Sequence, residues 1–273
     1  ELCKVLTVTE VAKHFGINWK TVKTIDKFFL ERQYAQTDYQ NLRILAVDEI
    51  AVKKGHRYLT VVLDYLSGRV VWVGKERTKE TLGTFFAGMT QEQRQKLEAI
   101  AMDMWDPYIH AVKKHVPHVK IVFDLFHVVS SFGKVIDKVR NAEYHKASKK
   151  DKDVIKGSKY LLLKNKRNIR RKKHREHLKQ LLSLNETINT VLILKDKLKH
   201  LCTYTSRTWA RKAIDEWSHL AKTVNHSVVH KFANMLTKYS YGILNHCDYK
   251  IHTSKLEGVN NKIRFFSQLV NNN

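Results

Sequence analysis

The sequence predicts an α/β protein in which a mixed sheet is interrupted by a long helical insertion and preceded by a small helix-turn-helix. Three observations support this fold class. β-Branched runs within residues 43–75 are followed by alternating helix and strand patterns up to residue 124. Strand patterns then stop, and helical patterns continue to about residue 250. A pair of short helices with start signals precedes the first strand.

Residues 1–32 are predicted to form the helix-turn-helix. Thr7 and Glu10 have the T-x-x-E spacing of a capping box, which begins a short helix. Gly16 permits the positive φ of a tight turn, and Asn18 can cap the second helix. The side chains expected on the inner face are Val8, Val11, Ala12, Phe15, Val22 and Ile25.

The outer face of the second helix carries polar and cationic side chains. Lys20, Thr21 and Lys23 stand near its start, where a recognition helix meets the major groove of DNA. This pattern predicts DNA binding. The alternative is an ordinary helical hairpin with a solvated face.

Residues 42–128 contain all the predicted strands. Their order of strands and helices is β-β-β-α-β-α-β, in which three antiparallel strands lead into a mixed sheet with crossover helices. That is the order of the ribonuclease H-like fold. The expected strands are 43–52, 57–66, 69–75, a short strand ending at Asp103, and Val119–Asp124, and the expected helices are Lys79–Leu97 and Pro107–His115.

Residues 129–250 are predicted to form a basic helical insertion. Lys164 to Arg175 (KNKRNIRRKKHR) is its most cationic block. Helical periodicity returns at residues 185–201 and 208–221. The bulky side chains expected to anchor the second of these segments are Trp209, Ile214 and Trp217.

The distribution of charge indicates a polyanionic partner. Fifty Lys and Arg residues against 26 Asp and Glu residues give a net charge of +24. Residues 1–128 hold 19 basic and 15 acidic residues, whereas residues 129–273 hold 31 and 11. The second half therefore presents a positive surface, which most simply fits nucleic acid. A solvated helical face or a ribosome-associated protein is the alternative.

Several classes of protein are excluded by composition. Cys3, Cys202 and Cys247 have no C-x-x-C spacing, which predicts neither disulfides nor a zinc site and favours a reducing, cytoplasmic compartment. No apolar run approaches 18 residues, so we expect no membrane span. The first residues lack the pattern of a signal peptide. The absence of an initiator Met suggests a fragment or a processed product.

Two acidic residues stand where a divalent metal ion would explain them. Asp48 interrupts the apolar run LAVDEIAV, and Asp103 ends the apolar run AIAMD. A carboxylate in such a setting is costly unless it is paired or bound to a cation. The first and fourth strands are neighbours in the predicted order, so both acids can converge. Mg²⁺ prefers oxygen ligands, and a pair of ions can promote phosphodiester transfer. A strand-end cap or a salt-bridged acid is the alternative for each residue alone.

Three segments resemble, in order, the catalytic segments of bacterial insertion-sequence transposases of the ISL-three family. The resemblance extends from about Asn18 to Arg264, and it implies a DDE transposase with a ribonuclease H-like core and a helical insertion. The segments are AVDEIAVKKGHRYLTVVLDYLSGRVVWV, AMDMWDPYIHAVKKHVPHVKIVFDLFHVV and HTSKLEGVNNKIR.

The resemblance implies a role for individual residues. Asp48 would be the first catalytic acid, Asp103 the second and Glu257 the third, the last on a C-terminal helix of the core within residues 251–273. Together they would hold two Mg²⁺ ions, with Mn²⁺ as a substitute. Asp124 and His127 match the D-x-x-H motif of related transposases.

DNA is the partner that this assignment implies, both as element ends and as target. We expect a homo-oligomer on DNA, a bacterial cytoplasmic protein that joins the nucleoid when bound, and no small-molecule substrate. Beyond the helix-turn-helix, the residues expected to contact DNA are Lys166, Arg167, Arg170, Arg171, Asn260 and Arg264.

Alternatives exist for three of these positions. Asp124 also ends an apolar strand and could be the second acid, although Asp103 follows the first long helix, as that fold requires. Asp106 is a weaker rival, because it precedes Pro107 and is expected to cap the next helix. His127 could be a structural histidine that hydrogen-bonds Asp124.

The sequence also departs from the family pattern at both ends. It lacks the cysteine-rich zinc-binding segment that usually comes first, and it stops shortly after the expected glutamate helix. We therefore keep two further hypotheses beside an active transposase. The first is an inactive, truncated remnant that binds DNA. The second, disfavoured by the helical insertion, is another ribonuclease H-like nuclease such as a junction resolvase.

Overall fold

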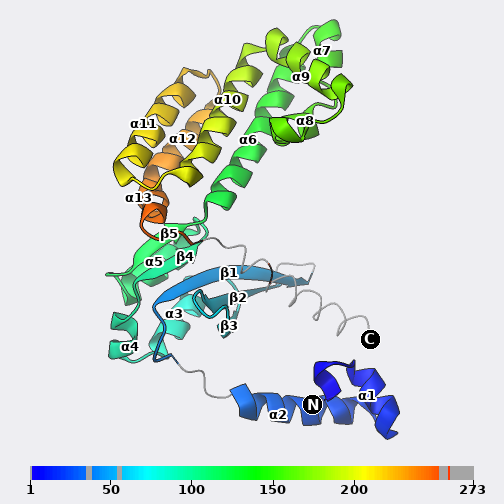
Figure 1. Ribbon diagram of the computed structural model, residues 1–273, viewed down its shortest axis with the longest axis vertical. Helices are drawn as coiled ribbons and strands as arrows, with labels where there is room; N and C mark the ends of the chain where they lie inside the picture. The colour runs from blue at the N-terminus through cyan, green and yellow to red at the C-terminus, as the bar shows by residue number, and fades with distance from the viewer. Residues whose placement is uncertain (1, 35–38, 54–56, 252–257, 259–273) are drawn as a thin grey trace. The chain divides into compact units, whose positions relative to one another are not determined.

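The computed structural model describes residues 2–34, 39–53, 57–251 and 258, and Figure 1 shows its helices and strands. The chain divides into two compact units, Glu1–Asn41 and Leu42–Asn273. Each unit has its own buried apolar side chains.

The first unit consists of η1 (Leu2–Lys4), α1 (Val8–Phe15) and α2 (Trp19–Tyr34). The predicted capping box is confirmed, since the backbone N–H of Glu10 donates to the Thr7 hydroxyl at 3.2 Å and that of Thr7 donates to the Glu10 carboxylate at 2.8 Å. Gly16 ends α1 with a φ of 64°. The Asn18 side chain accepts from the backbone N–H of Lys20 at 2.9 Å. Local start and stop signals therefore determine both helices.

The core of this unit is smaller than the sequence predicts. Val11, Ala12 and Val22 are buried together. Phe15 and Ile25, which were expected on the inner face, are 57% and 48% exposed, so that prediction is wrong. The reason is length, because α1 has only eight residues and covers α2 only around Val22.

The second unit is built on a mixed five-stranded sheet of order β3-β2-β1-β4-β5. The first three strands pair antiparallel, and β4 and β5 run parallel to β1. This confirms that the first and fourth strands are neighbours, and the sheet is compatible with a ribonuclease H-like fold. The strands are β1 (Ile44–Lys53), β2 (Arg57–Asp64), β3 (Val70–Lys75), β4 (Ala99–Met102) and β5 (Lys120–Phe123).

The connections between strands are α3 (Lys79–Ala87), α4 (Gln91–Gln95) and α5 (Asp106–His115). The prediction of one helix over residues 79–97 is wrong. The chain turns after Gly88, where Thr90 and Gln93 form a second capping box with contacts of 2.8 and 3.2 Å. A new helix starts there because the capping side chains satisfy its first backbone N–H groups.

Beyond residue 124 the described chain is helical. Within the ranges described, no helix is both long and apolar enough to cross a membrane. The elements are α6 (Leu125–Lys146), α7 (Lys149–Ile155), α8 (Lys159–Leu163), η2 (Lys166–Asn168), α9 (Lys172–Leu184), α10 (Glu186–His200), η3 (Leu201–Thr203), α11 (Arg207–Thr223), α12 (Ser227–Lys238), α13 (Ser240–Leu244) and η4 (Asn245–Cys247).

Four of these helices, α6, α10, α11 and α12, pack into a bundle (Figure 1). Its centre is aromatic: the ring of Phe132 lies 5.4 Å from that of Trp217 and 4.9 Å from that of Phe232. The Trp217 indole N–H donates to the Leu194 carbonyl at 2.7 Å. The burial of Ile214 and Trp217 confirms two predicted anchors. Trp209 is 60% exposed, so its predicted role is wrong, because it lies one residue away from the inward position of Ala210.

Side chains from the end of the bundle hold it to the sheet. The Asn245 side chain donates to the Ile121 carbonyl on β5 at 2.8 Å. The Asp106 carboxylate accepts from the Tyr239 hydroxyl at 2.8 Å and pairs with Lys238 at 3.2 Å. Asp106 therefore does not cap α5 as predicted, because Trp105 holds the N-cap position and the Asp106 carboxylate is bound to these two residues.

The close approach of α13 to β5 makes Gly242 sensitive to substitution. A Cβ atom there would lie 2.4 Å from the buried Phe123 ring, whereas one at Gly88 would meet nothing closer than 3.5 Å. We expect Gly242→Ala to lower the free energy of unfolding by about 1–3 kcal/mol, because the core is already filled. Gly88→Ala is the control and should be neutral or slightly stabilising. Urea denaturation of both variants measures this, and equal stabilities would contradict the packing described.

Candidate active site

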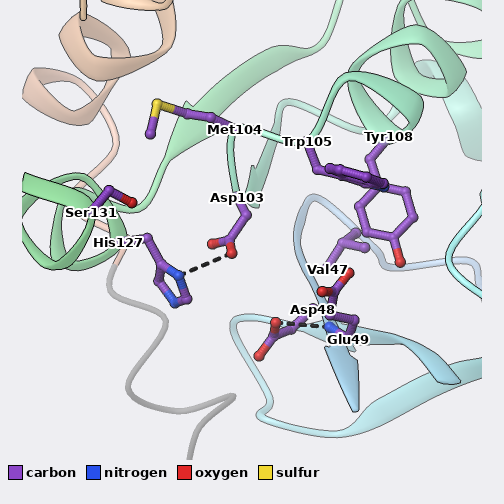
Figure 2. Close-up of a pocket in the computed structure, with 9 residues that line it drawn as sticks. All are labelled: Val47, Asp48, Glu49, Asp103, Met104, Trp105, Tyr108, His127 and Ser131. Atoms are coloured by element: carbon purple, nitrogen blue, oxygen red, sulfur yellow. Dashed lines mark hydrogen bonds and ion pairs between the residues drawn. The ribbon is translucent and has the colours of Figure 1, made fainter. Parts of the chain in front are cut away.

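The register of the parallel strands β1 and β4 brings Asp48 and Asp103 together. Ala46 pairs with Ala101, and each acid lies two residues beyond its alanine in the same direction. Both carboxylates therefore reach the same edge of the sheet. They line one cavity of about 160 Å³ (Figure 2). Its lining residues are Val47, Asp48, Glu49, Asp103, Met104, Trp105, Tyr108, His127 and Ser131.

Asp48 lies in an unfavourable environment for a negative charge. Burial, together with the nearby charge of Asp103, raises the pKa of its carboxyl to about 6. The backbone N–H of Glu49, which donates to Asp48 at 2.7 Å, and the charge of His127 only partly oppose this. The site therefore concentrates negative charge that a divalent cation would neutralise.

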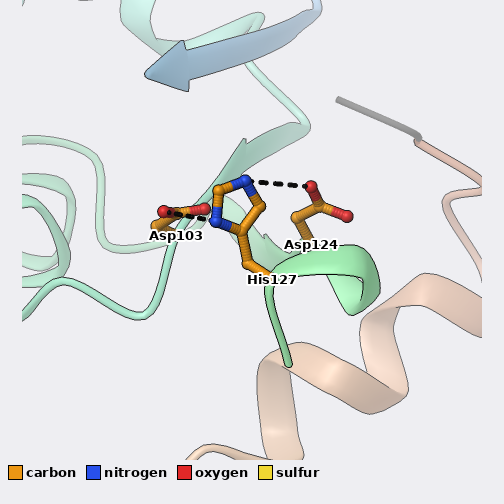
Figure 3. A group of neighbouring side chains, drawn as sticks. All are labelled: Asp103, Asp124 and His127. Atoms are coloured by element: carbon orange, nitrogen blue, oxygen red, sulfur yellow. Dashed lines mark ion pairs between the residues drawn. The ribbon is translucent and has the colours of Figure 1, made fainter. Parts of the chain in front are cut away.

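His127, in the first turn of α6, lies between two acids (Figure 3). Its Nδ1 is 2.9 Å from the Asp103 carboxylate, and its Nε2 is 3.7 Å from that of Asp124. The hydrogen bond to Asp103, with the charges of Asp103 and Asp124, raises the pKa of His127 to about 9 despite burial. The alternative role of His127, a structural histidine, placed its hydrogen bond on Asp124. The shorter contact of the ring is with Asp103 instead.

Asp124 has a different position from the other two acids. It is 5% exposed, and its side chain caps α6 by accepting from the backbone N–H of Phe126 at 2.9 Å. It is not among the residues that line the cavity, whereas Asp103 is, and the charge of Asp103 raises the pKa of Asp48. These observations favour Asp103 over Asp124 as the partner of Asp48.

A second grouping of possible metal ligands must be weighed. Asp103, Asp124 and His127 each offer one ligand atom within 4.8 Å of the others. However, the two ring nitrogens of His127 face different carboxylates, so the imidazole separates the acids (Figure 3). That arrangement suits a cationic positioning residue better than a ligand.

Other predicted site residues are placed as follows. Glu257, Asn260 and Arg264 lie outside the described residues. Lys20, Thr21 and Lys23 are exposed on α2. Lys166, Arg167, Arg170 and Arg171 are exposed on the segment from η2 to the start of α9, which the buried Ile169 anchors. Of these four, Lys166 pairs with Asp196 at 3.1 Å.

Sequence reasoning missed a second group at the cavity. Arg77 pairs with Glu49 at 2.7 Å, and its guanidinium lies 4.0 Å from the ring centre of Tyr58 and 4.9 Å from that of Trp105. Nearby, the Tyr108 hydroxyl contacts that of Thr60 at 2.7 Å, and burial raises the pKa of Tyr108 to about 12. One signal was available, because Glu49 is a second acid in the apolar run that holds Asp48 and needs a partner.

Comparison with known proteins gives the family. A family model described as a transposase, of the DDE type and the ISL-three group, matches residues 45–269. The chain belongs to this family of transposases. The match confirms the resemblance of the three segments, and its range includes Glu257, Asn260 and Arg264.

Two curated relatives are also named as transposases for insertion sequence elements. The chain is 38% identical to the transposase for insertion sequence element IS1001 of Bordetella parapertussis, with 97% of the chain and 66% of the relative covered. It is 26% identical to the transposase for insertion sequence element IS1557 of Mycobacterium tuberculosis, with 96% and 64% covered. The chain therefore spans just under two thirds of the length of these relatives.

The environment of Asp48 predicts a stability change in the metal-free protein. Because folding raises its pKa from an ordinary 3.8 to about 6, the native state binds this proton more tightly than the unfolded state. The free energy of unfolding therefore falls as pH rises from about 4 to 6. Above pH 6 the ionised Asp48 destabilises the native state by its full amount. Asp48→Asn should raise the free energy of unfolding at pH 8 by about 1–2 kcal/mol, allowing for partial solvent screening.

Denaturation in chelator at pH 8 and pH 4 measures this effect, and the gain should shrink toward zero at the lower pH. Asp124→Ala is the control acid, and it should instead destabilise by about 0.5–2 kcal/mol through the lost helix cap. A loss of stability in Asp48→Asn at pH 8 would disprove the electrostatic account of the cavity.

Proposed function

We propose that this chain is the catalytic part of a DNA transposase that cuts the ends of its element and joins the freed 3′ hydroxyl to target DNA. The observation that carries the proposal is the convergence of Asp48 and Asp103 from adjacent parallel strands on one cavity. Family membership and the printed names of the relatives as insertion-sequence transposases support it.

The donor set fits divalent metal ions. Asp48 and Asp103 offer hard oxygen ligands, and burial together with the nearby charge of Asp103 raises the pKa of Asp48. Among the described lining residues there is no Lys or Arg, and His127 is already paired with Asp103. Asp48, Asp103 and Glu257 would hold two Mg²⁺ ions. When bound, the ions would activate the attacking oxygen and stabilise the leaving oxygen.

The remaining residues of the site position these acids. His127 contacts Asp103 and in turn faces Asp124, which is fixed at the start of α6 by its own capping bond. Asp103 follows the last residue of β4, so without such support its side chain could adopt several rotamers. We assign His127 and Asp124 as positioning residues for Asp103.

DNA would be held by surfaces outside the cavity. The exposed cations Arg167, Arg170 and Arg171 lie close together in sequence on a segment that Ile169 anchors to the helical part. Lys20, Thr21 and Lys23 are the proposed contacts of α2 with element ends. Phosphate contacts of this kind hold DNA in place, and contacts to base edges select its sequence.

The first test of this function separates chemistry from binding. Asp48→Asn removes a metal ligand with almost no change in volume, so it should abolish Mg²⁺-dependent nicking of element-end DNA, by at least about 100-fold. Binding of the same DNA should persist or strengthen, because a negative charge near phosphate is gone. Gel-based nicking and binding assays on element-end and scrambled duplexes measure both.

Asp153→Asn provides the matched control, since Asp153 is exposed on α7 and should leave nicking unchanged. Undiminished nicking by Asp48→Asn would refute the DDE assignment. A wild-type chain that binds element ends but never nicks them with Mg²⁺ or Mn²⁺ would be the inactive DNA-binding protein considered from the sequence.

A second test concerns the basic segment. Replacing Arg167, Arg170 and Arg171 with Gln should reduce the slope of log affinity against log salt by about 2–3, because each phosphate contact contributes about 0.9. Lys166 is left in place because it pairs with Asp196. Fluorescence anisotropy at several salt concentrations gives the slope.

The control variant replaces three exposed lysines of the sheet region with Gln, which removes the same charge. Its slope of log affinity against log salt should change less. An equal change in both variants would mean that the segment is only part of a general positive surface. The control residues are Lys75, Lys114 and Lys120.

A further inference from the structure

Trp105 is an exposed aromatic side chain at the proposed active site. It lies two residues after Asp103, at the N-cap of α5, and lines the same cavity as Asp48 and Asp103 (Figure 2). Its exposed fraction is 37%. Part of the indole ring is therefore accessible beside the two carboxylates.

Contacts with Arg77 hold the orientation of the Trp105 ring. The indole N–H donates to the Arg77 carbonyl at 3.3 Å, and the Arg77 guanidinium lies 4.9 Å from the ring centre. Arg77 is itself held by its ion pair with Glu49 at 2.7 Å and by Tyr58, whose ring centre is 4.0 Å away. The ring is therefore fixed by polar contacts and remains partly open to solvent, which lowers the entropy cost of stacking a ligand on it.

The backbone that carries Arg77 is strained. Within the described ranges, Glu76 is the one residue other than glycine with a positive φ, 71°. Its N–H donates to the Tyr58 carbonyl at 2.8 Å, and its carbonyl accepts from the Thr60 hydroxyl at 2.6 Å. Such strain persists only where surrounding contacts enforce it, and it often occurs at functional sites. The strained residue, Glu76, directly precedes Arg77, whose guanidinium contacts the rings of Tyr58 and Trp105.

We propose that Trp105 is a stacking platform for an unpaired nucleobase of the DNA strand whose phosphate is held at Asp48 and Asp103. This inference rests on the proposed function and adds the form of the substrate. Bases inside a duplex are stacked on each other, so an aromatic platform at the site can be used only by a base that has left the stack. Every base has a π face, so the platform would tolerate any sequence.

The proposal explains why two contrasting features are adjacent. The carboxylates would bind phosphate through cations, whereas Trp105 offers an apolar face of the kind that nucleobases favour. Extrusion of one nucleotide would expose the neighbouring phosphodiester to the acids. The energy lost in unstacking would be partly recovered on the indole ring.

The test uses duplexes with the terminal sequences of the chain's own element, in which a single abasic site is moved past the nicked position. Binding is measured in Ca²⁺, and nicking in Mg²⁺. At one position, removal of the base should weaken binding by the wild-type chain about 10-fold, and Trp105→Ala should weaken binding of intact DNA by a similar factor. Combined, the two changes should give no further loss.

Two variants control this experiment. Trp105→Phe keeps an aromatic face without the indole N–H and should recover part of the affinity. Trp209→Ala removes another exposed tryptophan, on α11, and should show no coupling to any abasic position. Thermal unfolding of each variant reports on folding, and Trp105→Phe extends the test if Trp105→Ala unfolds.

The outcomes separate this inference from the proposed function. The stacking role alone would be overturned if the losses of affinity from Trp105→Ala and from the abasic site were additive at every position, while the chain still nicked DNA. A wild-type chain that neither binds nor nicks element ends would overturn the proposed function, and the inference with it. Coupling confined to one position beside the nick would support both.

Discussion

The parallel pairing of β1 with β4 is the constraint on which the rest of the site depends. It aligns Ala46 with Ala101, and the same register carries Asp48 and Asp103 to one edge of the sheet. Parallel strands need a crossover, and α3 and α4 supply it between β3 and β4. A slip of one residue would turn one carboxylate to the opposite face and disperse the site.

This convergence has an electrostatic cost that shapes the surroundings of the cavity. Two acids at one edge repel each other, and burial adds to the penalty on Asp48. His127 partly offsets the charge on Asp103, and Asp124 supports His127 from the start of α6. The first turn of α6, the longest described helix, is thus part of the site. The helical bundle and the sheet therefore meet at the proposed active site. Asp106, bound to Lys238 and Tyr239, joins the same two parts by a second contact.

Further contacts extend from the cavity to Arg77 and Trp105. Glu49 directly follows Asp48 but pairs with Arg77, whereas the pKa of Asp48 is raised by the charge of Asp103. Arg77 then links the sheet to Trp105 in the turn after β4. Charge and aromatic surface are therefore arranged by one strand and one loop. This arrangement places two carboxylates and an aromatic ring in the lining of one cavity.

The sequence by itself determined the features that depend on near neighbours or on strand order. These include the capping box of Thr7 and Glu10, the strands, and the convergence of Asp48 and Asp103. Tertiary structure decided the contacts between residues far apart in sequence. Helical periodicity could not show that Trp217 is buried while Trp209 is exposed, because that depends on which face α6 and α10 cover. Asp106 had a local cap as its obvious role, but Tyr239 lies 133 residues away and binds it instead. Arg77 and Trp105 carry no sequence signal for each other, since only the folded sheet brings a guanidinium against that ring.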